Sequence, residues 1–235
     1  MATTFNMLPE DCVSTILSLT SPADAYRLML TSSSLRSAAE SDLSFSLNKI
    51  SGRKSFVLSA RALSISFSEE PNHWTWTTSS ASRFSEVIEV KSVSSIQIEG
   101  RIKTQDLSPN TTYGAYLIIQ VSDRAFGLDS IASEISVSKD ECSVSNTAYL
   151  CPLDERKQLL ESLLFMNRRR MMEKLVLEGE GRRPSKREDG WMEIELGEFI
   201  VGQKSEVVQM NLMEVKGNQL KGGLIIEGIE VRPKC

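Results

Sequence analysis

An alternating run near the C-terminal end constrains the fold of this chain more than any other feature. The run follows a turn signal at Asp189-Gly190 and covers residues 192–196, with apolar side chains at even positions and glutamates at odd ones. Successive side chains of a β-strand point to opposite faces, so this pattern predicts a strand with one buried and one solvated face. The alternation recurs in 206–215 and 222–232, and upstream from Phe56 onward. The C-terminal three quarters of the chain are therefore predicted to form one antiparallel β-domain.

Further strand-like runs lie between residues 55 and 151, separated by short turn signals. Residues 113–121 are apolar at both alternating sets of positions, which is typical of a central strand covered on both faces. About ten strands at this spacing indicate a β-sandwich or jelly roll. Only residues 154–165 break the pattern, because their leucines recur at helical spacing and predict a helix. The remaining expected strands are 56–58, 63–68, 74–77, 86–90, 95–104, 126–138 and 147–151.

The composition is that of an ordinary globular protein and argues against several classes of partner. The chain has 235 residues, 25% of them charged, and a formal net charge of −4, so no overall positive field attracts nucleic acid or anionic lipid. No window approaches an uninterrupted apolar run of about 18 residues, and the N-terminus lacks signal-peptide features. We therefore expect a cytoplasmic or nuclear protein that binds neither specific nucleic acid nor membrane, with four reduced cysteines.

The residues available for chemistry argue against an enzyme. His73 is the single histidine, so every histidine-dependent catalytic arrangement or metal site would depend on it, and its polar turn favours a solvated residue. Neither of the common glycine-rich phosphate-binding patterns is present, and no cofactor or metal is expected. The basic runs 168–170 and 182–187 could serve nuclear import or phosphate binding, but interleaved glutamates favour a solvated surface.

The first fifty residues differ from the rest because they carry helical signals and no strand signal. Proline lies in the first turn of the first two expected helices, where a missing N–H is tolerated. About forty residues in short helices bury too little apolar surface to be stable alone. The unit is therefore expected to lean on a partner protein or, as a helical cap, on the β-domain. The expected helices are 8–17, 21–29 and 34–41.

The N-terminal unit resembles an F-box, the domain that docks on the Skp-type adaptor of an SCF ubiquitin ligase while a partner domain recruits the target. The likeness rests on the leucine-proline opening and Ile-Leu pair within 7–17, the Ser-Pro-x-Asp start within 21–25, and residues 34–39. An exposed apolar helical face needs a partner groove, which gives the likeness a physical reason. The residues implied to contact the adaptor are Leu8, Pro9, Val13, Ile16, Leu17, Pro22 and Leu28.

This unit departs from the usual F-box pattern at its end. The third helix is shortened, and residues 42–45 lead almost directly into 51–54 without the usual linker of several dozen residues. Leu43, Phe45 and Leu47 would be poorly hidden in a free tether, so we expect them to pack on the helical unit or on the β-domain. The expected organisation is an F-box-like domain over 1–48, a short linker over 49–54 and the β-domain over 55–235.

The β-domain resembles the phloem protein 2 domain of plants, the lectin domain related to the jasmonate-inducible tobacco lectin. The likeness covers roughly residues 55–234, and its motifs lie in 58–65, 74–76, 107–117, 189–199 and 221–233. With the F-box, the chain resembles F-box members of the phloem protein 2-like family. The resemblance implies an α+β fold, in which a small three-helix F-box precedes a mainly antiparallel, jelly-roll-like β-sandwich. It also implies binding of N-acetylglucosamine oligomers and N-glycan cores.

The resemblance also implies where a sugar would bind. Two tryptophans that flank a turn in the tobacco lectin are implicated in sugar contact, and they correspond here to Phe67 and Trp74, with Trp76 on the same face as Trp74. An aromatic ring covers the apolar side of a pyranose, and polar groups bind its hydroxyls. Because Phe67 lacks an indole N–H, weaker or altered sugar binding is expected. Packing in the core is the open alternative for Trp74 and Trp76.

Two functions from different classes are compatible with these features. The first is a non-catalytic substrate-recognition subunit of an SCF-type ubiquitin ligase, whose targets carry N-acetylglucosamine-containing glycans. The second is a cytoplasmic or nuclear lectin with a degenerate F-box that acts without ubiquitin transfer. The nearly intact docking helices favour the first. A homodimer formed through the lectin domain stays open.

Overall fold

The computed structural model describes residues 43–47, 53–129, 131–139, 142–152, 181–214 and 219–234. The helices expected at 8–17, 21–29, 34–41 and 154–165 lie outside these residues. The described part is β-structure, as expected for the C-terminal domain, with two short 3-10 helices, η2 (Ala60–Ala62) and η3 (Thr104–Asp106). No helix within it is long and apolar enough to cross a membrane.

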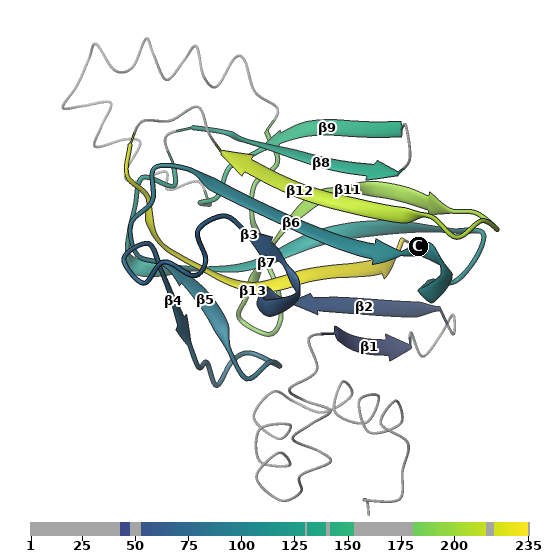
Figure 1. The fold of residues 1–235 in the computed structure, drawn as a ribbon, viewed down its shortest axis with the longest axis horizontal. Coiled ribbons are helices and arrows are strands. Elements are labelled where there is room, and N and C mark those ends of the chain that lie inside the picture. Colours follow the sequence, from purple (N-terminus) through teal and green to yellow (C-terminus); the bar gives the residue numbers. More distant parts are fainter. Residues whose placement is uncertain are drawn as a thin grey trace, which may run out of the picture.

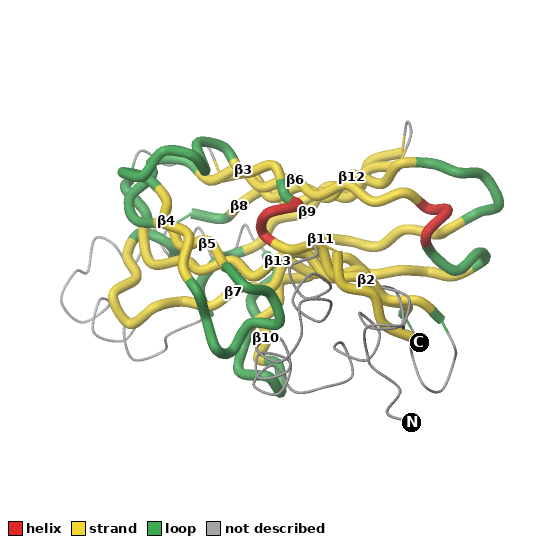
Figure 2. The backbone as a smooth tube through the Cα atoms, turned by 60° about the horizontal axis from the view of Figure 1, so that its bottom comes forward, coloured by secondary structure: helices red, strands yellow, loops and turns green. Residues whose placement is uncertain are grey.

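Two antiparallel sheets pack face to face as a sandwich (Figures 1 and 2). Sheet A has the order β1-β2-β13-β7-β11-β10, and β4 and β5 branch from β13; sheet B has the order β3-β6-β12-β8-β9. Sheet A contains β1 (Leu43–Leu47), β2 (Lys54–Ser59), β4 (Trp74–Thr77), β5 (Val87–Val90), β7 (Thr111–Phe126), β10 (Ser185–Lys186), β11 (Met192–Val201) and β13 (Gly222–Pro233). Sheet B contains β3 (Ser64–Ile65), β6 (Ile96–Lys103), β8 (Ser133–Lys139), β9 (Cys142–Ala148) and β12 (Val207–Glu214).

The core lies between the two sheets and is built from alternate residues of their strands. In β6, the isoleucines at 96, 98 and 102 are all buried in this core, so they share one face of the strand. In β11, Ile194 and Leu196 are buried in the same core, whereas Glu193 is only partly buried on the other face. The period-two pattern of the sequence therefore predicted the face that each of these strands buries.

The central position expected for residues 113–121 is confirmed by β7. This strand is paired with β13 on one side and β11 on the other. Leu117 and Ile119 face the core between the sheets. The opposite face of β7 is covered as well, by a second apolar cluster formed by Val87, Tyr116, Ile118 and Trp191. Because both faces are covered, the strand carries apolar residues at every position from Ala115 to Ile119.

Residues 43–47, which the sequence placed in the helical unit, form strand β1 of sheet A. The segment pairs with β2 in a regular antiparallel register, from Leu43 opposite Leu58 to Leu47 opposite Lys54. Of the two partners that the sequence left open for this segment, its backbone joins the β-domain (Figure 1). The sheet therefore begins at residue 43, well before the expected start at residue 55.

The strands predicted at 126–138 and 147–151 differ from those in the structure. β7 continues to Phe126, β8 begins only at Ser133, and β9 spans residues 142–148. The first six residues of β9 are exposed, because it is the outermost strand of sheet B. A strand exposed on both faces does not show the apolar alternation on which the sequence prediction depended.

Candidate functional site

The turn between β3 and β4 presents the exposed aromatic ring of Phe67 at the edge of the β-domain. Phe67 is 60% exposed, and its ring lies edge-on to the ring of His73 at 6.3 Å between centroids. Backbone hydrogen bonds fold the turn tightly: the Glu70 N–H donates to the Phe67 carbonyl at 2.9 Å, and the His73 N–H donates to the Glu70 carbonyl at 2.9 Å. The ring is therefore presented to solvent by a fixed backbone.

Phe67 also has an unusual backbone conformation. Its φ of 62° lies in the left-handed region, where a residue with a Cβ costs roughly 1–2 kcal/mol. Among the described residues outside glycine, only Asn110 shares a positive φ, and asparagine tolerates it better. A strained backbone that holds a large apolar ring in solvent has no benefit for packing. Such outliers gather at binding sites, so we treat this turn as the candidate site.

Polar side chains lie in the same turn as Phe67. The His73 Nδ1 lies 2.8 Å from the Ser92 carbonyl oxygen, and its Nε2 lies 3.1 Å from the carboxylate of Glu70. Lys91 donates from its Nζ to the carbonyl of Pro71 at 3.0 Å, which ties the turn to the end of β5. The sequence identified His73 as a turn residue but gave no sign of these contacts. The side chains of Glu70 and His73 are about half exposed, so their polar atoms are accessible to solvent.

Trp74 is not part of this surface, which corrects the sugar-contacting role predicted for it. Its side chain is buried, with 2% of the residue exposed, and it belongs to the core between the sheets. Its indole N–H donates to the Ser66 carbonyl at 3.1 Å, so the one polar atom of the ring is satisfied inside the protein. A ring without an exposed face cannot stack on a pyranose. The packing alternative therefore describes Trp74.

Trp76 is partly buried, and a cation covers the face of its ring. The guanidinium carbon of Arg61 lies 3.5 Å from the ring centroid, within the range of a cation–π contact. Arg61 is held there by the carboxylate of Glu86 at 2.8 Å. The described residues offer no hydrogen-bond partner to the buried indole nitrogen. Of the three aromatic residues predicted to contact sugar, only Phe67 therefore presents an open ring.

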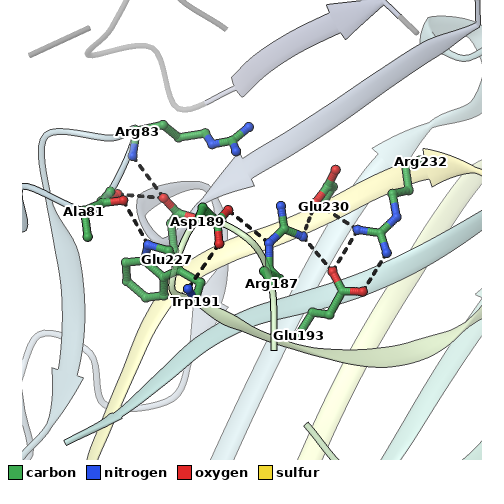
Figure 3. A network of polar contacts seen from close by, with 10 residues as sticks. Ala81, Arg83, Arg187, Asp189, Trp191, Glu193, Glu227, Glu230 and Arg232 are labelled. Atoms are coloured by element: carbon green, nitrogen blue, oxygen red, sulfur yellow. Dashed lines mark hydrogen bonds and ion pairs between the residues drawn. The ribbon is translucent and has the colours of Figure 1, made fainter. Parts of the chain in front are cut away.

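A network of paired charges covers the outer face of sheet A (Figure 3). The Arg187 guanidinium donates to Glu193 and to Glu230, both at 2.6 Å. Arg232 donates to the second oxygen of Glu193 at 2.6 Å and lies over the ring of Tyr116 at 3.8 Å. Burial raises the pKa of the Glu193 carboxyl, but hydrogen bonds and charges from Arg232 and Arg187 outweigh burial and lower that pKa overall. Arg187 is thus neutralised within the protein, which speaks against a phosphate-binding role for this basic run.

A buried carboxylate fastens the loop between β4 and β5 to the same face. Glu227 accepts a hydrogen bond from the Ser82 hydroxyl at 2.9 Å and another from the Arg83 backbone N–H at 3.0 Å. Beside it, the Trp191 indole N–H donates to the Ala81 carbonyl at 2.9 Å (Figure 3). The contacts join residues more than 100 positions apart, so the sequence gave no signal for them. They hold the loop that precedes Glu86 and β5.

We expect the stability of the protein to fall with rising pH through the titration of Glu227. Burial raises the pKa of its carboxyl above the ordinary value, against the opposing charge and hydrogen bonds of Arg83 and Ser82. A raised folded-state pKa adds stability below the unfolded-state pKa of about 4 and loses it as pH rises through the folded-state pKa. The Glu227→Gln variant cannot titrate there. The melting temperature of the wild type, relative to that variant, should therefore decrease as pH rises from about 4; a constant difference contradicts the prediction.

Comparison with known proteins places this geometry in a family. Residues 53–233 match the phloem protein 2 family, and residues 5–47 match the F-box domain. Two proteins of Arabidopsis thaliana, F-box protein PP2-B13 and F-box protein VBF, are each 41% identical to this chain, over 97% of it and over 98% and 99% of their own lengths. F-box protein PP2-B15 of the same plant is 40% identical, over 97% of this chain and 96% of its own.

These relatives also bear on the short connection between the two parts of the chain. The alignment with PP2-B13 spans 278 positions, whereas this chain has 235 residues, so the relative contains residues that this chain lacks. The two family matches here are separated only by residues 48–52. The match to the phloem protein 2 family covers most of the chain, and the relatives match nearly all of it. The chain therefore belongs to the phloem protein 2 family, with an F-box domain preceding its phloem protein 2 domain.

Proposed function

We propose that this protein is the substrate-recognition subunit of an SCF-type ubiquitin ligase. The observation that supports this function best is that an F-box domain and a phloem protein 2 domain occupy adjacent ranges of one chain, 5–47 and 53–233. The F-box docks on a Skp-type adaptor, and the β-domain binds the target. The subunit itself performs no chemistry, and it acts in the cytoplasm or nucleus.

The adaptor-binding surface is the apolar stripe of the F-box, whose residues lie outside the described part of the structure. Leu8 and Ile16 recur at helical spacing on this stripe. Charging either one should reduce adaptor affinity by roughly 30-fold or more, which corresponds to an interface hot spot of about 2 kcal/mol. Leu8→Asp and Ile16→Asp are therefore expected to abolish co-purification of a Skp-type adaptor with the full chain.

Ser14 supplies the matched control, because helical spacing places it on the opposite face from Leu8 and Ile16. Ser14→Asp adds the same charge and should leave co-purification intact. The competing function is a lectin with a degenerate F-box that acts without ubiquitin. One observation favours it: residues 43–47, at the end of the F-box match, pair with β2 of the sheet. A wild-type chain that retains no adaptor would establish that competing function.

The target-binding activity proposed for the β-domain is recognition of N-acetylglucosamine-containing glycans at the Phe67 turn. The exposed ring offers an apolar face to the pyranose, and Glu70 and His73 offer polar groups to its hydroxyls. One open ring with few polar groups supports weak binding, on the order of millimolar to micromolar, about −4 to −8 kcal/mol. Trp74 takes no part in this binding, because its ring is buried.

Phe67→Gly is expected to abolish glycan binding without loss of stability. Glycine removes the ring and also relieves the left-handed backbone, which costs a Cβ-bearing residue roughly 1–2 kcal/mol. Titration calorimetry with N-acetylglucosamine oligomers should then show no binding, while the melting temperature stays equal or rises. Phe126→Ala removes another exposed ring, on β7, and should leave binding unchanged. Full binding by Phe67→Gly would exclude this turn as the sugar site.

A further inference from the structure

His73 has a hydrogen-bond acceptor at each nitrogen of its ring. The Nδ1 atom lies 2.8 Å from the Ser92 carbonyl oxygen, and the Nε2 atom lies 3.1 Å from a carboxylate oxygen of Glu70. Neither a carbonyl nor an ionised carboxylate can donate a hydrogen bond. The doubly protonated ring carries an N–H on both nitrogens, so only this charged form of His73 makes both contacts. The neutral ring has to give up one of them.

The fixed position of the Ser92 carbonyl determines which contact the neutral ring keeps. The Lys91 and Ser92 N–H groups both donate to the His73 carbonyl, at 2.8 and 3.4 Å, and so hold the backbone of Ser92 beside the ring. The Glu70 carboxylate instead ends a flexible side chain that is 55% exposed, where water replaces a lost hydrogen bond. The neutral ring therefore keeps the proton on Nδ1 and loses the proton on Nε2.

Loss of the Nε2 proton releases the Glu70 side chain but leaves the turn folded. The Glu70 N–H donates to the Phe67 carbonyl at 2.9 Å. The Glu70 carbonyl accepts from the His73 and Trp74 N–H groups, at 2.9 and 3.1 Å. None of these bonds involves the imidazole ring. The protonation of His73 therefore changes the acceptors that lie beside the Phe67 ring, whereas the backbone that presents this ring stays in place.

Two other charged residues belong to this part of the described structure. Glu69 precedes Glu70 in the turn. Lys91 follows β5, and its Nζ donates to the Pro71 carbonyl at 3.0 Å. Within the described residues, the ion pair of His73 is the one with Glu70. Glu70 is therefore the charged side chain that responds directly to the proton on His73.

We propose that the protonation of His73 controls glycan binding at the Phe67 turn, and that the neutral form binds more tightly. This inference rests on the glycan binding proposed above. In the charged form, His73 and Glu70 are bound to each other. In the neutral form, Nε2 and the Glu70 carboxylate become two acceptors beside the exposed Phe67 ring, suited to a sugar O–H and to the N–H of an N-acetyl group. His73 is thus a positioning residue that decides whether Glu70 is available to the sugar.

Nuclear magnetic resonance of the imidazole tests the protonation step without any sugar. His73 is the single histidine of the chain, so the untagged full-length protein gives one set of ring signals that needs no assignment. At about pH 8 the ring nitrogen shifts should place the proton on Nδ1, and at about pH 5.5 on both nitrogens, because histidines change charge in this range. A neutral ring with its proton on Nε2 overturns the proposal, since Glu70 then stays bound in both forms.

Titration calorimetry with N-acetylglucosamine oligomers tests the control of binding. From about pH 8 to about pH 5.5 the affinity of the wild type should fall about fivefold or more, because only the neutral fraction of the sites binds tightly. His73→Gln cannot gain a proton, so its affinity should be the same at both pH values. An affinity of the wild type that is unchanged or higher at the lower pH overturns the proposal.

Glu69→Gln is the matched control, because it removes a carboxylate of the same turn that is not ion-paired with His73 in the described structure. This variant should keep the pH dependence of the wild type. If Glu69→Gln loses that dependence, the overall charge of the turn controls binding, and the proposed pair of Glu70 and His73 is excluded. Binding that is constant with pH removes this inference alone, whereas a chain that binds no oligomer at either pH also removes the proposed glycan binding.

Discussion

Replacing Trp74 with alanine is expected to lower the free energy of unfolding by about 3–5 kcal/mol, the cost of truncating a buried tryptophan. The ring is 2% exposed and packs in the core between the sheets, so its removal leaves a cavity there. The Ser66 carbonyl also loses the indole N–H that it accepts. Urea unfolding followed by tryptophan fluorescence of the remaining indoles measures the change. Glycan binding should fall as well, but only in proportion to the unfolded fraction.

Trp76→Ala is the matched control for Trp74. It removes the same side chain two positions along β4, where the ring is only partly buried and covered by Arg61. We expect a clearly smaller loss of stability than for Trp74→Ala, because less apolar surface returns to water. If Trp74→Ala kept full stability and lost only glycan binding, Trp74 would be a binding residue after all, and its burial in the core would be wrong.

Lys221→Met is expected to destabilise the protein by about 3–5 kcal/mol, because it breaks a buried ion pair by removing one partner. Lys221 and Glu214 are each 2% exposed, and the Lys221 Nζ lies 2.5 Å from the Glu214 carboxylate. The Nζ also donates to the carbonyls of Ser94 and Gln219, at 2.7 and 3.0 Å. The variant leaves a carboxylate in the interior without this cation. Urea denaturation measures the loss.

The double variant Glu214→Leu/Lys221→Met separates the ion pair from simple packing. Replacing both charges by apolar groups of similar size removes the buried carboxylate, so the double variant should be more stable than Lys221→Met alone. A double variant that is destabilised by the sum of the two single changes would show that the two side chains do not interact. The carbonyls of Ser94 and Gln219 lose the Lys221 donor in both variants. This loss therefore cancels when the stabilities of the single and double variants are compared.

Features that depend on a local pattern could be predicted from the sequence. Strand β11 and its buried face followed from the alternation at 192–196, and the central position of β7 followed from apolar residues at every position. The two domains and their family followed from short motifs, such as those in 7–17 and 189–199, and the family matches over 5–47 and 53–233 confirm them. In each case the signal lies within a few consecutive residues. Periodicity and short motifs carry that information without any knowledge of distant partners.

The candidate site could be predicted only in part. The sequence indicated the turn between residues 67 and 74, but it assigned the sugar-contacting role to Trp74 as well as Phe67. The alternation of side chains along a strand places Trp74 and Trp76 on the same face of β4. It does not indicate whether that face is buried in the core or exposed to solvent. The answer depends on the core between the sheets, in which Trp74 is buried, and on Arg61, which covers the ring of Trp76.

The sequence by itself therefore determined the β-rich class of the C-terminal domain, its family and the position of the candidate turn. The tertiary structure alone decided that Phe67 carries the open ring and that residues 43–47 join sheet A. It also decided that Glu227 binds a loop 145 positions away, and that β9 is the last strand of sheet B among the described elements. The physical reason is that burial and pairing are properties of two surfaces in contact. One stretch of sequence specifies its own periodicity, whereas its partner is chosen by the packing of the whole chain.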